Sequence, residues 1–183
     1  MTSRSLATAR LVLRELTAAD CSDAYVGWLA DPEINRFLET RHSVQDAASV
    51  AAFVEGVRAR DNEFLFGLFL REEDGRHIGN IKVGPIHPYH RVADISLFVG
   101  DRASWGRGYA AEAIAGLSRY AFETLGVLKL SASMYSPNQG SRHAFLKAGY
   151  REEGLRRGHY RLGDERCDVI ELGLLPADLE GAQ

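Results

Sequence analysis

Residues 105–113 read WGRGYAAEA and begin a long alanine-rich segment whose apolar residues have helical spacing. Glycine costs roughly 0.5–1 kcal/mol relative to alanine inside a helix, so two glycines at one helix start need a local reason. A helix N-terminus offers unpaired N–H groups and a partial positive charge, and glycine lets a phosphate approach the backbone. The stretch therefore predicts a pyrophosphate bound by the backbone from Gly106 to Ala110, with the Arg107 cation beside it. A tight turn or close helix packing is the alternative explanation.

Two common phosphate-binding motifs do not fit this stretch. GRGYAA matches G-x-G-x-x-A, but a dinucleotide-binding fold runs its strand into the first glycine and places an acidic residue at the end of the next strand. Here residues 101–104 intervene, and the next predicted strand ends in Tyr135 and Ser136. No G-K-[ST] sequence is present, which excludes a P-loop.

Hydrophobic periodicity around this helix indicates one layered α/β domain, residues 1–183. Asp74-Gly75 is a dipeptide that favours a type I′ hairpin turn between two apolar strands. The predicted helices span 17–30, 32–39, 44–60, 106–125 and 138–148, and the predicted strands span 9–16, 63–72, 76–86, 92–100, 127–136, 150–155 and 166–175.

Composition narrows the class of protein. The chain has 183 residues, 45% of them hydrophobic and 26% charged, with a net charge of −3 spread over interspersed signs, so we expect no nucleic-acid or membrane partner. The N-terminus has no apolar run that would make a signal peptide, which favours a cytoplasmic protein. Cys21 and Cys167 stand alone, and His87 and His90 lack a third ligand, so no metal site is expected.

Two stretches resemble a known family. ADISLFVGDRASWGRGYAAEAI, residues 93–114, resembles the acetyl-coenzyme A motif of the GNAT N-acetyltransferases, and NQGSRHAFLKAGYREEG, residues 138–154, resembles the motif that follows it. Trp105 replaces the family's Gln or Arg, as in the branch of ribosomal-protein and small-amine acetyltransferases. The resemblance implies a GNAT fold: one mixed, mostly antiparallel sheet with splayed central strands and helices on both faces.

The resemblance also implies direct transfer of an acetyl group from acetyl-CoA to a primary amine, without a covalent cysteine or a metal. Main-chain groups of the strand before the helix would bind the pantetheine arm and polarise the thioester. The residues implied to bind the coenzyme are Phe98, Val99, Gly100, Gly106, Arg107, Gly108, Tyr109, Ala110, Asn138 and Arg142.

Proton transfer has two candidate residues. Many members of the family carry a tyrosine seven residues after the motif asparagine as the acid for the leaving thiolate, but this sequence has Phe145, which has no proton to donate. Ser141 is the remaining donor of the motif, and a solvent-facing helix serine is its alternative reading. Asp94 is out of phase with Ile95 and Leu97, so it faces the opposite side of its strand and can accept the amine proton. A strand-edge salt bridge is the alternative role of Asp94.

The acceptor side is predicted in residues 28–41, WLADPEINRFLETR, with Trp28, Arg36, Glu39 and Arg41 as candidate contacts. Trp28 can equally be a core residue. The stretch resembles acetyltransferases of amino-sugar nucleotides, which favours a nucleotide amino sugar as acceptor beside a protein N-terminal amine. A polyamine acceptor, a non-catalytic acyl-CoA-binding module and a homodimer stay open.

Overall fold

An eight-stranded sheet runs through the molecule, in the order β1-β2-β3-β4-β5-β6-β8-β7. The computed structural model describes residues 4–180, so residues 1–3 and 181–183 of the expected domain lie outside the described part. Neighbouring strands are antiparallel except for β5 and β6, which are parallel, as in the predicted mixed sheet. The strands are β1 Ser5–Ala7, β2 Leu11–Glu15, β3 Phe64–Leu70, β4 His77–Val83, β5 Val92–Val99, β6 Lys129–Tyr135, β7 Arg151–Leu162 and β8 Glu165–Leu174.

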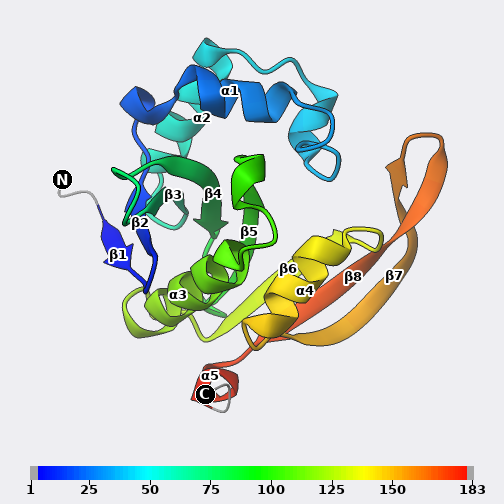
Figure 1. Cartoon of the computed structure of the whole chain (residues 1–183). Coiled ribbons are helices and arrows are strands. Elements are labelled where there is room, and N and C mark those ends of the chain that lie inside the picture. Colours follow the sequence, from blue (N-terminus) through cyan, green and yellow to red (C-terminus); the bar gives the residue numbers. More distant parts are fainter. Residues whose placement is uncertain (1–3, 181–183) are drawn as a thin grey trace.

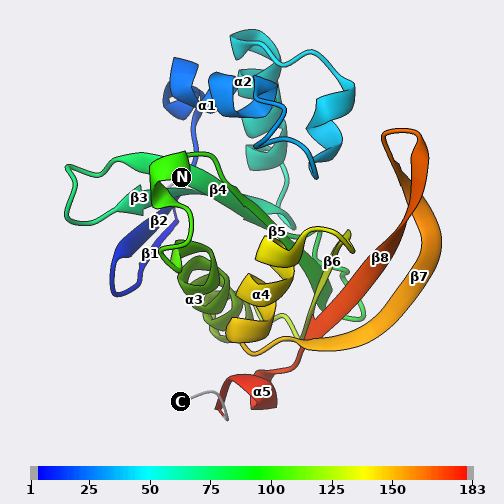
Figure 2. The same cartoon turned by 45° about the vertical axis from the view of Figure 1, so that its right-hand side comes forward.

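Helices cover both faces of the sheet. Figures 1 and 2 show α1 and α2 on one face and α3 and α4 side by side on the other. This arrangement confirms the predicted fold class. The helices are η1 Ala18–Asp20, α1 Asp23–Ala30, η2 Glu39–His42, α2 Ala47–Arg58, η3 Arg102–Ser104, α3 Tyr109–Glu123, α4 Gln139–Lys147 and α5 Pro176–Glu180. Within residues 4–180, none of them combines the length and apolar character needed to cross a bilayer.

The apolar sequence of β3 reflects its place between the two helical layers. Phe66 is fully buried in the main core together with Ile114 and Leu117 of α3, whereas Leu65 is buried in a second cluster with Val54 of α2. Successive side chains of a strand point to opposite faces, so a strand covered on both sides is apolar throughout.

The two central strands part soon after they meet. β5 and β6 pair only through Val92 with Lys129, Ala93 with Leu130, and Asp94 with Ser131. Beyond these pairs the strands diverge, as Figure 1 shows. The predicted splay is confirmed, and the rest of β5 has a free edge on that side.

Two predicted helices differ from the structure. Of the predicted helix 32–39, residues 32–38 form turns and bends and Glu39 begins η2, because the Asp31 carboxylate accepts the N–H of Glu33 (2.9 Å) and Asn35 Nδ2 donates to the Leu29 carbonyl (2.7 Å). Such local side-chain bonds compete with helical ones. Helix α2 begins after Asp46, which caps Ser49 N–H (2.7 Å), and not after Ser43 as predicted.

The other predicted helices and strands are present in the structure, and most of them differ from it only in where they begin and end. The first predicted helix, 17–30, is divided into η1 and α1, and β1 and α5 are additional elements. The hairpin turn is confirmed, since Asp74 and Gly75 have φ of 49° and 70° and Arg76 N–H donates to the Glu73 carbonyl (2.9 Å). The last hairpin is longer than predicted, because β7 continues to Leu162.

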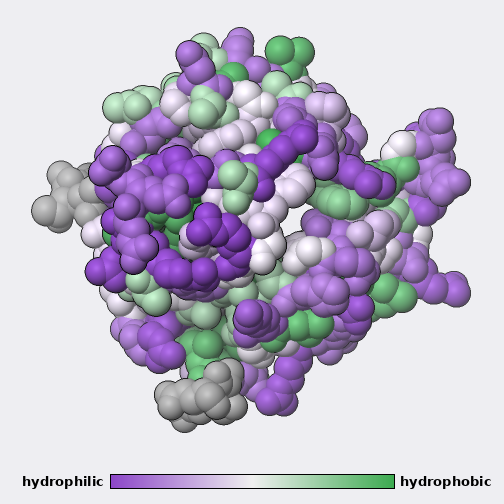
Figure 3. All heavy atoms as spheres, viewed as in Figure 1, coloured by the Kyte–Doolittle hydropathy of each residue, from purple (hydrophilic) through white to green (hydrophobic). Residues whose placement is uncertain are grey.

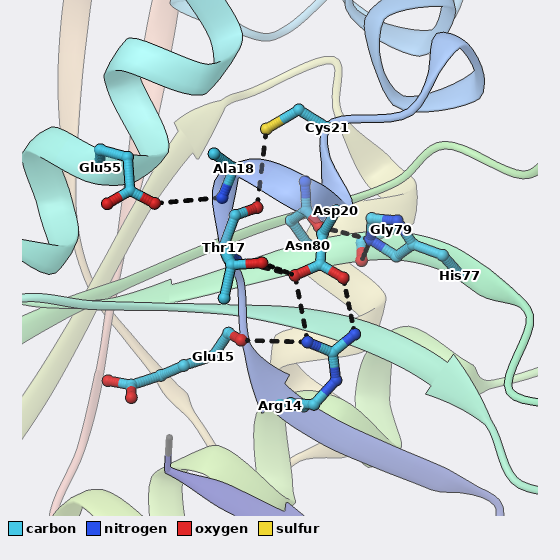
Figure 4. Close-up of polar contacts among 10 residues, drawn as sticks. All are labelled: Arg14, Glu15, Thr17, Ala18, Asp20, Cys21, Glu55, His77, Gly79 and Asn80. Atoms are coloured by element: carbon cyan, nitrogen blue, oxygen red, sulfur yellow. Dashed lines mark hydrogen bonds and ion pairs between the residues drawn. The ribbon is translucent and has the colours of Figure 1, made fainter. Parts of the chain in front are cut away.

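A partly buried ion pair holds the start of the α1 layer to the sheet. Figure 4 shows the Arg14 guanidinium of β2 facing Asp20, with Nη2 to Oδ1 at 2.7 Å, while Thr17 N–H donates to the same carboxylate at 2.8 Å. Burial opposes ionisation of Asp20, but the bonds from Arg14 and Thr17 outweigh it and lower the pKa of Asp20 to about 2.

Replacing Asp20 by asparagine should therefore lower the free energy of unfolding by about 1–2 kcal/mol at pH 7. Because the folded pKa lies below the unfolded one, this contribution is present above pH ~4 and disappears as the pH falls to ~2. Denaturant titrations across this range, with Asp61→Asn in an exposed loop as the control, measure the difference. An equal loss at pH 7 and pH 2 would contradict the assignment.

Candidate active site

The glycines of the opening motif lie before the helix and not within it. Helix α3 begins at Tyr109, and Gly106 and Gly108 have φ of 71° and 80°, in the left-handed region that favours glycine. The N–H of Trp105 donates to Arg102, and the N–H of Glu112 donates to Gly108. Between them, the N–H groups of residues 106–111 have no acceptor among residues 4–180. A tight turn and a set of unpaired N–H donors within residues 4–180 thus coexist at one site.

The Glu112 carboxylate is bound by the segment between β1 and β2. This carboxylate accepts Thr8 Oγ1 (2.6 Å) and the backbone N–H and Nε of Arg10 (both 2.7 Å). Burial opposes ionisation, yet these hydrogen bonds keep the pKa of Glu112 below its usual value. Arg10 Nη1 also donates to the carbonyl of Arg107 (2.9 Å), so the β1–β2 hairpin steadies the turn.

Trp105 connects the turn to the free edge of β5. Its indole Nε1–H donates to the Val99 carbonyl at 2.7 Å, while 41% of the residue stays exposed. The side chain therefore supplies a hydrogen bond and a flat surface, and carries no charge.

The free edge of β5 is formed by Leu97 and Val99. Gly100 N–H donates to Ile78 on the β4 side (2.9 Å), and alternation along the strand turns the backbone groups of Phe98 the same way. The N–H groups of Leu97 and Val99 consequently point toward the splay. Of the three residues at which main-chain contacts are expected, Phe98, Val99 and Gly100, only Val99 has its backbone groups on the free edge. The backbone groups of Phe98 and the Gly100 N–H face β4.

Two cavities meet at the splay. The smaller, of about 620 Å³, lies between the α3 turn, α4 and the loop before η2. The larger, of about 750 Å³, lies between β4, β5 and the α1–α2 side and reaches β6. Figure 3 shows the surface in this region hollowed and paler than its hydrophilic rim. Both linings include Phe37, Leu38, Leu97, Phe98, Asn138 and Ser141.

The expected motif residues are concentrated on the smaller cavity. Lys147 and Arg36 also line it, and neither has an ion-pair partner among residues 4–180. Its lining includes Phe98, Val99, Gly106, Gly108, Tyr109, Ala110, Asn138 and Ser141.

Asn138 and Ser141 stand where the cavities join. Asn138 Oδ1 accepts the N–H of Ser141 (3.2 Å), so the side chain caps α4 while its amide nitrogen is left for another partner. No partner of the Ser141 hydroxyl is recorded in residues 4–180. Phe145 lines the larger cavity and packs edge-on against Tyr150, with ring centroids 4.9 Å apart.

A polar and aromatic cluster closes the larger cavity on the β6 side. Tyr135 donates its hydroxyl proton to Glu39 Oε1 (2.5 Å) and accepts a bond from Arg41 Nη2 (2.7 Å). The rings of Tyr160 and Phe37 lie 5.1 and 6.0 Å from that of Tyr135. Burial raises the pKa of the Tyr135 hydroxyl, which keeps it a proton donor. Sequence reasoning missed Tyr135, although its place at the end of the splayed strand was a usable signal.

Among the acceptor candidates, Trp28 and Arg36 lie elsewhere than expected. Trp28 is outside both linings, because its ring packs against Gly100, where an added Cβ would be 2.1 Å away. Arg36 lines the smaller cavity and not the larger one. Glu39 lines the larger cavity. Arg41 donates to the Tyr135 hydroxyl, which in turn donates to Glu39.

Two expected phosphate contacts are directed outward. The Arg107 guanidinium lies over the Tyr109 ring (5.2 Å) and 3.9 Å from Glu73, outside both linings. Arg142 Nε donates to Glu152 on β7 (2.5 Å), also outside both linings. Both cations thus take part in local ion pairs outside the smaller cavity.

As strand alternation predicts, Asp94 lies on the same face of β5 as Ser96, which lines the larger cavity. The residue itself lies outside both linings, at the closed end of the splay beside Ser131. Partial desolvation raises the pKa of its carboxyl, although the side chain stays exposed.

Comparisons with known proteins agree on one family. Residues 10–151 match the family described as an acetyltransferase (GNAT) domain. The chain is 28% identical over 154 residues to the uncharacterized N-acetyltransferase YoaA of Bacillus subtilis (strain 168), covering 83% of this chain and 85% of YoaA.

Solved structures share the fold. Mycobacterium smegmatis RimJ in complex with CoA-disulfide has a TM-score of 0.79 and 21% identity, over 97% of this chain and 87% of RimJ. Spermidine N-acetyltransferase from Vibrio cholerae in complex with CoA and spermine has a TM-score of 0.82 and 19% identity, over 93% of this chain and 98% of that one.

Strands β4 and β5 lie in close backbone contact at Gly79. A Cβ there would lie 2.3 Å from the Phe98 carbonyl and 2.8 Å from Val99 Cα, both backbone atoms. Gly79→Ala should therefore destabilise the fold by about 1–3 kcal/mol in denaturant unfolding. Gly56→Ala is the control, since open space surrounds this helical glycine and the change should stabilise by about 0.5–1 kcal/mol. Similar effects of the two substitutions would refute the close strand contact.

Proposed function

Since this chain belongs to the GNAT acetyltransferase family, we propose that its smaller cavity binds acetyl-CoA and its larger cavity binds the amine that receives the acetyl group. The observation that carries this proposal is the junction of the two cavities, which Leu97, Asn138 and Ser141 line together. A thioester and an amine bound on either side of this junction would meet there.

The coenzyme side is supported by charge and by free donors. The N–H groups of residues 106–111 and the positive end of α3 suit a pyrophosphate. Arg36 and Lys147 line the same cavity and supply cations in place of the outward-facing Arg107 and Arg142. Two solved structures of the same fold, RimJ and the spermidine N-acetyltransferase, are complexes with CoA-disulfide and with CoA.

Acetyl transfer forms a C–N bond and breaks the C–S bond, so the amine loses a proton and the thiolate gains one. The N–H groups of Leu97 and Val99 can stabilise the oxyanion that develops between these events. Ser141 Oγ is the proposed donor to sulfur, because Phe145 has no proton to give. Asp94 and Glu39 are the carboxylates available to accept the amine proton, directly or through water.

The proposed acceptors are a nucleotide amino sugar and a protein N-terminal amine. A polyamine is less favoured, because Glu39 is the one carboxylate in the described lining of the larger cavity, and Tyr135 already donates to it. The cytoplasmic location, the single domain over residues 1–183 and the homodimer stay predictions.

A free-thiol assay with acetyl-CoA and a panel of amines tests the function. The panel contains nucleotide amino sugars, N-terminal peptides and polyamines, and we expect thiol release that depends on a primary amine. Coenzyme binding without amine-dependent release from any of them would contradict the proposal.

Replacing Ser141 by alanine should lower kcat by about 10²-fold, at the low end of general-acid effects, because the leaving thiolate loses its proton donor. The KM for acetyl-CoA should change little. Ser5→Ala on β1, remote from both cavities, is the control and should keep the full rate. An unchanged kcat in Ser141→Ala would remove this residue as the acid.

A further inference from the structure

Two buried polar atoms lack a hydrogen-bond partner in residues 4–180, and both belong to the larger cavity. They are Thr40 Oγ1 and Asn80 Nδ2. Buried polar groups are nearly always paired in folded proteins, so each exception calls for an explanation. Because both residues line one cavity, a ligand bound there could supply the missing partner.

The amide of Asn80 is held in one orientation. The residue is 2% exposed, and its Oδ1 lies 2.7 Å from His77 Nε2, which also lies 3.0 Å from the Gly79 carbonyl (Figure 4). Because both neighbours of Nε2 are hydrogen-bond acceptors, this ring nitrogen carries the proton and donates it. Rotating the amide would put Nδ2 against this N–H, so the nitrogen stays on the side away from His77.

His77 is itself fixed and uncharged. Its ring stacks on Phe69 at 4.8 Å and meets Trp28 edge-on at 5.2 Å, and burial lowers its pKa. The Asn80 orientation therefore rests on a neutral, packed imidazole.

The Asn80 nitrogen keeps a hydrogen for a ligand. Burial raises the pKa of the Tyr25 hydroxyl to about 12. The Asn80 amide beside this hydroxyl offsets part of that rise. Because an amide nitrogen carries two hydrogens, even a contact with Tyr25 leaves one of them free.

The register of the sheet puts this donor near the reacting groups. Asn80 lies directly opposite Phe98, and side chains of opposed residues share one face at neighbouring positions. Phe98 lines both cavities. A ligand bound to Asn80 therefore lies next to the junction where the amine is expected.

The surrounding wall is largely uncharged. Lys82 is the one lysine or arginine in the described lining, and it is paired with the buried Glu63. No cation is thus left on this side for a phosphate. The apolar part of the wall includes Leu29, Phe37, Phe53, Met134 and Tyr160.

We propose that Asn80 selects amines in which the carbon next to the amino-bearing carbon carries an uncharged oxygen, as in an α-amino amide. The rest of such an amine is apolar or aromatic. Asn80 Nδ2 donates to this oxygen, and the wall receives the apolar or aromatic part. The inference rests on the proposed function and narrows its acceptor class, disfavouring an amino sugar with phosphates.

The test compares two amines that differ in one carboxamide group, L-phenylalaninamide and 2-phenylethylamine, with each kcat/KM expressed per neutral amine because the carboxamide also lowers the pKa of the amino group. The wild type should show a kcat/KM about tenfold or more higher for the amide, as expected for one buried hydrogen bond. Asn80→Asp keeps the shape and the oxygen facing His77 but loses the donor, and Asn80→Leu removes both. Each should reduce the ratio to below about threefold.

Asn62→Asp, outside both cavities, is the matched control and should keep the wild-type ratio. If Asn80→Leu does not fold, Asn80→Asp still gives the ratio. A wild-type ratio near one, an unchanged ratio in Asn80→Asp, or transfer to other amines while neither probe is acetylated would overturn the inference and leave the acetyltransferase intact. Absence of transfer to any amine would contradict the proposed function itself.

Discussion

The early parting of β5 and β6 is the constraint on which the rest of the structure depends. Three paired positions hold the strands together, and after Asp94 the β5 edge has no strand beside it. A free edge inside a protein would normally invite another strand. Here α4 and the loop before η2 flank the gap, and two cavities occupy it.

The splay and the glycine turn form one unit. Trp105 bridges them through its bond to Val99, and Arg10 ties the same turn to the β1–β2 hairpin. These bonds connect the turn, with its free N–H groups, to the β5 edge and to the hairpin. Preorganised donors stabilise developing charge without reorganisation cost during the reaction.

Local signals in the sequence were sufficient for much of the fold. Asp74-Gly75 marks its turn because the conformation depends on those two residues, and Asn138 marks the start of α4 because capping is local. Residues 32–39 were misread as a helix because Asp31 and Asn35 bind backbone groups instead.

The glycine turn at the smaller cavity was predictable, because it follows from consecutive residues, whereas the lining of the larger cavity was less so. Tyr135 meets Glu39 and Arg41, and Asn80 meets His77 within a wall built by distant segments. These contacts depend on strand register and on where two cavities open. No periodicity in the sequence reports them.

The central claim is that main-chain N–H groups of the turn and of the β5 edge bind the coenzyme. Amide resonances followed by NMR during titration with coenzyme A test it most directly. We expect the largest shifts at residues 106–111, at Leu97 and at Val99, and expect pantetheine alone to move only the β5 resonances. Saturable binding that leaves the amides of 106–111 unshifted would contradict the account.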